Sequence, residues 1–257
     1  MEELGYRSAR GVLAALDAKE LSSVELLDHL LARVDRHNPA INAVVTLDAE
    51  RARDRAQEAD AARARGERWG PLHGLPMTVK DAFETEGVRT TCGATDLSDH
   101  VPARDADAVA RLKDAGAIVF GKTNLPAYAA DIQTANEVFG TTNNPWAADR
   151  IVGGSSGGSA AALAAGLTPL ELGSDIGGSI RNPAHFCGVY GHKPTYGIVP
   201  GRGHIPGPPG SLTEPDVGVF GPLARSVADL ELAMEVVAEP SREKAGGCRE
   251  QVPVSSE

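Results

Sequence analysis

The chain has 257 residues, of which 42% are hydrophobic and 23% are charged, and 25 Lys+Arg against 35 Asp+Glu give a formal net charge of −10. This composition is typical of globular proteins and argues against disorder, collagen and coiled coil. An acidic chain without a basic cluster has no general attraction for nucleic acid or an anionic membrane, so we expect neither as a partner. The three cysteines form no CxxC pair, which argues against a disulfide framework and a zinc ribbon.

The N-terminus and the longest apolar stretch bear on localisation. The first ten residues contain no apolar segment of the kind found in a signal peptide. Residues 160–172 are the longest apolar stretch, but Gly166 and Pro169 interrupt it and it is shorter than the ~20 residues of a membrane helix. The sequence therefore predicts a cytoplasmic protein.

The first quarter of the chain predicts three helices and one strand. Apolar spacing over residues 8–37 indicates two helices, the second capped by Ser22 or Ser23 and ended by Pro39. A strand is expected at 42–47, followed by a helix at 48–65 whose mixed charges indicate a solvated surface rather than a binding patch.

From residue 75 onward, short apolar strands alternate with helices, which indicates the α/β class. No repeat or linker divides the chain, so a single domain over residues 1–257 is expected. The expected strands lie at 76–81, 117–120, 170–172 and 217–220, and the expected helices at 105–115, 159–165 and 226–237, with Ser226 as the last N-cap. A further short helix is expected to open at Gly178 and to be disturbed by Pro183.

Three sequence patterns that often mark functional sites occur here in surroundings that do not fit those functions. Residues 116–123 fit GxxxxGK[ST], but a helix precedes them and their middle is a strand, which is the reverse of a phosphate loop. Residues 153–157 fit GxSxG, but a loop rather than a core strand leads into them. His185, Cys187 and His192 match no zinc spacing, so we expect no metal site there.

Six motifs in order carry a more specific signal. They are HGLP (73–76), KD (80–81), GKTN (121–124), GGSSGGSAAA (153–162), GSDIGGSIRNP (173–183) and FCGVYGHKPT (186–195). This set resembles the amidase signature family of serine hydrolases from about residue 71 to 239. The resemblance implies a mixed, largely parallel sheet flanked by helices, and it divides the chain into N-terminal helices (1–70), a catalytic signature core (71–239) and a divergent tail (240–257). Family domains are longer, so the fold is expected to be incomplete.

The glycines around Ser179 suggest how such a site would work. Glycine lets the backbone approach a substrate closely, so the N–H groups of Ile176, Gly177, Gly178 and Ser179 can converge as an oxyanion hole.

The resemblance assigns the remaining roles. It implies that Ser179 is the nucleophile, Ser155 the bridging serine on a cis peptide bond, and Lys80 the base. Lysine can act as a base only when it is neutral, which burial would favour. Ser156, Asp175 and Arg181 are expected to support the site, the last two by positioning the glycine loop.

The resemblance implies an amidase that hydrolyses a small carboxylic amide through a Ser179 acyl-enzyme, without cofactor or metal. The alternatives are the amidase subunit of a tRNA-dependent amidotransferase and a truncated, inactive homologue. The segment at residues 125–137 lacks the acidic, Met-rich form of that subunit, which favours a stand-alone amidase. A partner protein and dependence on glutamine would favour the subunit reading. The expected partner is a small-molecule amide, and a homodimer is left open.

Overall fold

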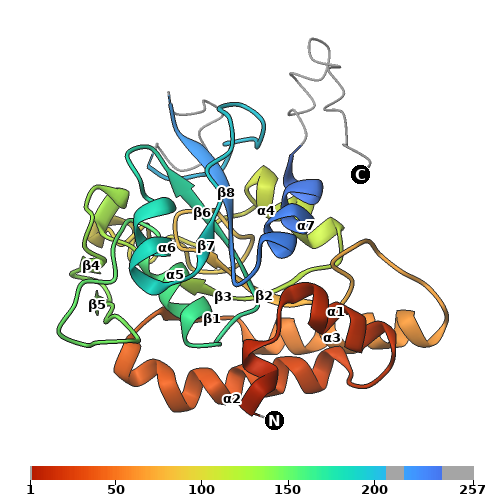
Figure 1. Ribbon diagram of the computed structural model, residues 1–257. Coiled ribbons are helices and arrows are strands. Elements are labelled where there is room, and N and C mark those ends of the chain that lie inside the picture. The colour runs from red at the N-terminus through yellow and green to blue at the C-terminus, as the bar shows by residue number, and fades with distance from the viewer. Residues whose placement is uncertain (1, 207–216, 239–257) are drawn as a thin grey trace, which may run out of the picture.

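The structure is a computed structural model that describes residues 2–206 and 217–238, so the tail at 240–257 lies outside the described residues. Its centre is a six-stranded sheet (Figure 1) with the order β1 (Val44–Leu47), β3 (Ile118–Thr123), β2 (Pro76–Lys80), β6 (Leu170–Asp175), β8 (Val219–Ala224) and β7 (Tyr190–Gly191). Strand β2 is parallel to β3 and β6, whereas β1 is antiparallel to β3, and β8 is antiparallel to β6 and β7. Four of the six strands thus run in one direction, and the expected mixed sheet with flanking helices is confirmed.

Helices surround this sheet, and short elements connect them. The remaining elements are η1 (Glu2–Tyr6), α1 (Ala9–Asp17), α2 (Ser23–Ile41), α3 (Ala49–Ala64), η2 (Thr95–Leu97), α4 (Asp107–Asp114), η3 (Ala127–Ala129), β4 (Ala135–Asn136), β5 (Gly140–Thr141), α5 (Gly157–Ala164), α6 (Arg181–Cys187) and α7 (Val227–Val237). In Figure 1, α2 and α3 lie side by side below the sheet, while α5 and α6 pack together on its left. Within the described residues, no helix is both long enough and apolar enough to cross a membrane.

The predicted pair of N-terminal helices is confirmed by α1 and α2, but the predicted end of the second is wrong. The Ser22 hydroxyl accepts the Glu25 N–H at 3.1 Å while the Glu25 carboxylate accepts the Ser22 N–H at 2.7 Å, a capping box that fixes the start of α2. Pro39 lies inside the last turn, where its missing N–H removes one intrahelical bond. The helix ends at Ile41, and its C-cap residue Asn42 has a left-handed φ of 57°.

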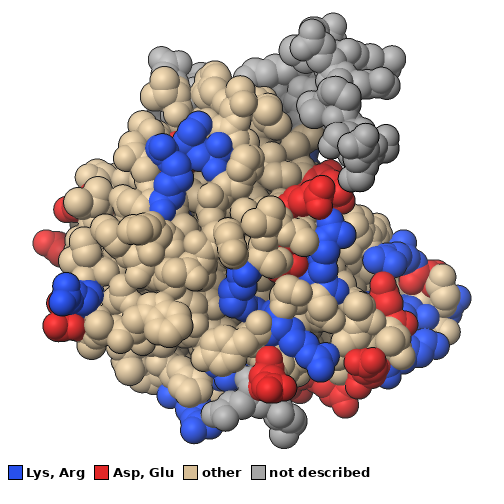
Figure 2. Space-filling model, in the orientation of Figure 1, with Lys and Arg blue, Asp and Glu red and all other residues tan. Residues whose placement is uncertain are grey.

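Helix α3 is the predicted surface helix. It packs through a stripe of small residues, Ala52, Ala56, Ala59 and Ala62, all of which are buried. Its remaining positions are mostly charged, and Figure 2 shows both signs of charge interspersed at the lower right of the molecule, where α1 and α3 lie. The mixed charges are a solvated helix face, as the sequence indicated.

The later helices follow the predicted pattern with one difference. Helices α4, α5 and α7 match the predicted ranges, and the Ser226 hydroxyl accepts the Asp229 N–H at 3.1 Å as the predicted N-cap. The helix expected to open at Gly178 starts instead at Arg181. Pro183 lies in its first turn, where a missing N–H has no intrahelical partner to lose, so it does not disturb the helix.

The rejected phosphate loop is a helix end followed by a strand. Gly116, with φ of 96°, follows α4, and β3 then runs from Ile118 to Thr123. In the parallel pairing of β2 and β3, Val79 lies opposite Lys122 and Lys80 lies opposite Thr123. Because successive side chains of a strand alternate between faces, Lys80 and Lys122 point to opposite faces of the sheet.

Candidate active site

Three segments that are far apart in the sequence contribute to one end of the sheet. Lys80 is the last residue of β2, and Ser174 lies near the end of β6, its parallel neighbour. The carboxyl ends of parallel strands share one edge, which is where α/β sheets usually place their sites. Ser155 and Ser156 directly precede α5, and Ser179 follows β6 in the loop before α6.

The Lys80 amine is fully buried among three serine hydroxyls. Its Nζ lies 2.6 Å from Ser155 Oγ, 2.9 Å from Ser174 Oγ and 3.1 Å from Ser156 Oγ. A neutral amine has two N–H donors and one lone pair, so it can donate to two hydroxyls and accept from the third. Ser156 has another acceptor for its own proton, the Ser174 main-chain oxygen at 3.3 Å. Of the two remaining hydroxyls, that of Ser155 lies nearer to the amine than that of Ser174.

The protonation of Lys80 is set mainly by its burial. Burial lowers the pKa of the Lys80 amine to about 7, against the opposing influence of nearby groups that include Asp175 and Glu171. An amine with this pKa is substantially neutral at pH 7, which is what a general base requires.

Ser155 and Ser179 line one cavity of about 60 Å³. Ser155 is buried and Ser179 is half-buried. The Ser156 N–H donates to the Ser179 carbonyl oxygen at 3.0 Å, which ties the segment before α5 to the loop after β6. Tyr128, His204 and Phe220 also line this cavity. Ser155 and Ser179 therefore border the same cavity.

Asp175 and Arg181 form an ion pair that also contacts the glycine loop. Arg181 donates from Nη2 to Asp175 Oδ1 at 2.9 Å and from Nε to Oδ2 at 3.1 Å. The same carboxylate accepts the N–H of Gly178 at 2.9 Å and of Ile180 at 3.0 Å. Although burial opposes it, these hydrogen bonds hold the pKa of Asp175 at about 2.

Of the four N–H groups predicted to form the oxyanion hole, one already donates to an acceptor within the protein. Gly178 has φ of 118°, a conformation that favours glycine, and its N–H already donates to Asp175. In the part of the chain that the structure describes, the N–H groups of Ile176, Gly177 and Ser179 donate to no other group. These three remain as candidate donors to a substrate oxygen.

The segment before α5 has the backbone that the family resemblance implies. The peptide bond between Gly154 and Ser155 is cis. Residues 142–156 form neither helix nor strand, which confirms that GxSxG here is not a nucleophile elbow. Gly158, in the first turn of α5, packs so tightly that an added Cβ would lie 2.3 Å from Asn124 N. A larger residue there would require the helix or the backbone at Asn124, which follows β3, to shift.

Cys187, one of the potential metal ligands in the sequence, has structural contacts. It is buried, and its Sγ lies 3.6 Å from the Val152 carbonyl oxygen. Burial raises the pKa of the Cys187 thiol to about 12, which disfavours the thiolate that metal binding needs. Across residues 2–206 and 217–238, no three His, Cys, Asp or Glu side chains gather as a metal-binding group.

Sequence reasoning missed one close neighbour of Lys80 and most of the cavity wall. Ser174 stands in the GSDIGGSIRNP motif, so its position offered a signal, but its contact with Lys80 depends on how β2 and β6 are aligned. No local pattern pointed to Tyr128, His204 or Phe220.

Comparison with known proteins gives the family. The family profile named Amidase matches residues 25–254. The chain belongs to the amidase family. It is 50% identical over 224 residues to a glutamyl-tRNA(Gln) amidotransferase subunit of Roseiflexus sp. (strain RS-1), covering 87% of this chain and 45% of that protein. Further relatives, 43% to 52% identical, carry the same name.

Solved structures of amidases share the fold. A bacterial aryl acylamidase of the amidase signature enzymes superposes with a TM-score of 0.87 at 31% identity, covering 96% of this chain and 50% of that one. The peptide amidase of Stenotrophomonas maltophilia superposes with a TM-score of 0.84 at 34% identity, covering 95% and 50%. The chain thus spans about half the length of the proteins it matches.

Proposed function

We propose that this amidase hydrolyses the carbon–nitrogen bond of a small carboxylic amide through an acyl-enzyme on Ser179, as the amidase subunit of a tRNA-dependent amidotransferase. The observation that carries the chemistry is the 2.6 Å contact between the buried Lys80 amine and Ser155 Oγ, beside a cavity that Ser155 shares with Ser179. Serine needs a base to become a nucleophile, and the lowered pKa of Lys80 to about 7 supplies one.

Each proton in the proposed reaction has a defined path. Ser179 Oγ bonds to the amide carbon while its proton passes to Ser155 Oγ, and the Ser155 proton passes to the Lys80 lone pair. The N–H groups of Ile176, Gly177 and Ser179 stabilise the oxyanion that forms. The carbon–nitrogen bond then breaks, and Lys80 returns the proton through Ser155 to the leaving amine. Water hydrolyses the ester and releases the carboxylic acid.

The names of the relatives favour the amidotransferase over a stand-alone amidase. The composition of residues 125–137 pointed to a stand-alone amidase, but that argument rests on one short segment. The relatives named as amidotransferase subunits match this chain over most of its length. Under this proposal the donor amide is that of glutamine, and the acceptor of the released nitrogen belongs to a partner.

The first test is covalent labelling of Ser179. Folded protein treated with a fluorophosphonate should gain the mass of one adduct. Ser179→Ala should gain none, while Ser98→Ala, at a serine outside the site, should react like the wild type. Circular dichroism would check that each variant folds. A folded wild type that forms no adduct, or an adduct that persists in Ser179→Ala, would refute the assigned nucleophile.

A second test distinguishes an amidotransferase subunit from a stand-alone amidase, which would use the same chemistry. Release of ammonia would be measured with glutamine and with simple aliphatic and aromatic amides. If glutamine is the only amide that is hydrolysed, and if the other proteins of the amidotransferase increase this rate, the result supports the subunit proposal. Turnover of simple amides without any partner supports the stand-alone amidase instead.

A further inference from the structure

Glu171, in the middle of β6, is a buried carboxyl group that the proposed reaction does not use. It accepts a hydrogen bond from Thr78 Oγ1 and another, at 3.4 Å, from Thr123 Oγ1. Ser159 is a third hydrogen-bonding neighbour of the carboxyl group, and its Oγ lies 2.9 Å from Thr123 Oγ1. Hydroxyls from three different elements therefore converge on one carboxyl group.

These hydroxyls belong to the elements that carry the proposed catalytic residues. Thr78 lies directly opposite Glu171 and precedes Lys80 by two residues on β2, so both side chains are on the same face of the sheet. Ser159 lies in the first turn of α5, whose N-terminus follows Ser155 and Ser156. Glu171 itself is on the strand that continues to Ser174. The cluster thus links β2, β6 and α5, the elements that carry Lys80, Ser174 and the helix after Ser155, at a point two residues before Lys80 on β2.

We propose that Glu171 is a positioning residue, whose carboxyl group fixes the strand that carries Lys80 against the helix that follows Ser155 by holding Thr78, Thr123 and Ser159 together. This inference rests on the proposed function, since Lys80 and Ser155 are the groups it aligns. Proton transfer depends on such alignment, because a misplacement of about 1 Å can lower a rate by about a hundredfold.

The charge state of Glu171 agrees with this role. Burial raises the pKa of the Glu171 carboxyl to about 8, against the opposing hydrogen bonds from the three hydroxyls and the charge of Lys122. The ionisable groups that act on this site are Lys80 on β2 and Lys122 on β3, while α5, which packs over it, carries none. A neutral carboxyl group leaves Lys80 free to lose its proton, whereas an ionised one would raise the pKa of Lys80.

The test compares an isosteric variant with one that removes the group. Phosphonylation of Ser179 by the fluorophosphonate would be followed over a range of probe concentrations and pH. Glu171→Gln keeps a neutral side chain of the same shape, and we expect its maximal rate constant within about threefold of the wild type with the same acid limb. We expect Glu171→Ala to lose about tenfold to a hundredfold in that rate constant, with little change in the half-saturating concentration.

A control variant and a second readout keep the inference falsifiable. Glu84→Ala removes another buried carboxyl group, one paired with His100 at 3.2 Å, and should cost stability without this loss of rate. If Glu171→Ala lowers only the melting temperature, or if Glu171→Gln loses as much rate as Glu171→Ala, the proposed positioning role is wrong.

NMR titration of the ¹⁵N-labelled Lys80 amine needs no reaction at Ser179. It should give the same titration midpoint in the wild type and Glu171→Gln and a different midpoint in Glu171→Ala, because the hydroxyls around Lys80 are displaced in the latter. An unchanged midpoint in Glu171→Ala would overturn the inference. A wild type that titrates in this way but forms no adduct would refute the proposed function instead.

Discussion

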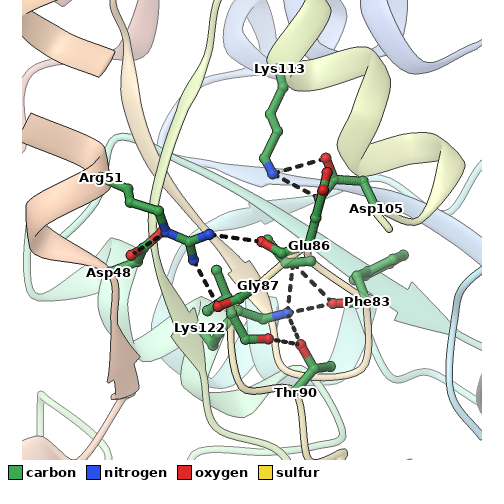
Figure 3. A network of polar contacts seen from close by, with 11 residues as sticks. Asp48, Arg51, Phe83, Glu86, Gly87, Thr90, Asp105, Lys113 and Lys122 are labelled. Carbon is green, nitrogen blue, oxygen red and sulfur yellow. Dashed lines mark hydrogen bonds and ion pairs between the residues drawn. The ribbon is translucent and has the colours of Figure 1, made fainter. Parts of the chain in front are cut away.

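Two fully buried lysines on adjacent strands show what burial alone does and does not provide. Lys80 and Lys122 are neighbours across the β2–β3 pairing but point to opposite faces of the sheet. Lys80 Nζ lies among serine hydroxyls that line or adjoin the cavity of Ser179. On the other face, the Lys122 Nζ donates to Phe83 O, to Thr85 Oγ1 at 2.9 Å and to Thr90 Oγ1 at 3.1 Å. Figure 3 shows Lys122 pointing toward Phe83 and Thr90.

The partners of Lys122 can only accept from it. The Phe83 group is a carbonyl, and the two threonine hydroxyls already donate their own protons to main-chain oxygens, Thr85 to Phe83 O at 3.1 Å and Thr90 to Val88 O at 3.0 Å. Three acceptors match the three N–H donors of an ammonium group. Burial lowers the pKa of Lys122 to about 8, with Asp81 acting in the opposite direction. Lys122 is thus suited to be a charged structural residue.

The surroundings of Lys122 extend this structural role. Its acceptors all lie in the loop at residues 83–90. The same loop receives hydrogen bonds from Arg51 to Glu86 O at 3.3 Å and to Gly87 O at 2.8 Å (Figure 3). Lys122 and Arg51 therefore fasten the loop to β3 and α3. Under the proposed mechanism, Lys80 differs from Lys122 because a neighbouring hydroxyl, that of Ser155, can give its proton to the amine and connects it to the cavity.

Replacing Lys80 should give the largest effect on rate. Lys80→Met keeps the length and burial of the side chain but removes the base, so we expect a loss of about 10²–10⁴-fold in Ser179 phosphonylation. The acid limb of the wild-type pH profile, expected near pH 7 because protonation of Lys80 stops the reaction, should disappear.

Stability gives an independent check on Lys80. Because its pKa is about 7 in the fold and its ordinary value is 10.5, the unfolded chain holds a proton between these pH values that the native state lacks. The Lys80 contribution to the free energy of unfolding therefore rises with pH across that window. Lys80→Met should remove this slope and be at least as stable as the wild type at pH 8. A variant that still shows an acid limb near pH 7 would mean that another group is the base.

The matched substitution on the opposite face of the sheet, Lys122→Met, should lower stability strongly and the rate only slightly. Lys122→Met removes the larger of the two positive charges, Lys122 and Arg89, that stabilise the buried Asp81 carboxylate, and we expect a loss of about 3–5 kcal/mol in the free energy of unfolding by urea denaturation. The phosphonylation rate of the molecules that remain folded should stay within about threefold of the wild type, because the hydrogen bonds of Lys122 go to Phe83, Thr85 and Thr90 on the other face of the sheet and not to Lys80. If Lys122→Met keeps the wild-type melting temperature but loses the phosphonylation rate, the distinction drawn between the two lysines is wrong.

Sequence reasoning reached the elements and the three proposed catalytic residues but not the contacts between them. Ser226 identified the start of α7 because an N-cap acts locally, and Pro39 misled because its effect depends on its place within the last turn of α2. The motifs around Lys80 and Ser179 were specific enough to assign roles by resemblance. The roles of Ser174 and Glu171 depend on the alignment of β2 with β6, which pairs residues about 93 positions apart in the chain.

The smallest expected effect tests the hydroxyls around Lys80 directly. Ser174→Ala removes one acceptor, 2.9 Å from the amine, but leaves Ser155 in place. A typical hydrogen bond contributes about 1 kcal/mol, so the phosphonylation rate should fall about fivefold. The lost acceptor favoured the protonated amine, so the pKa of Lys80 should fall and the acid limb should move to lower pH. An acid limb that moves to higher pH, or a rate as low as that of Lys80→Met, would mean that Ser174 rather than Ser155 gives its proton to the base.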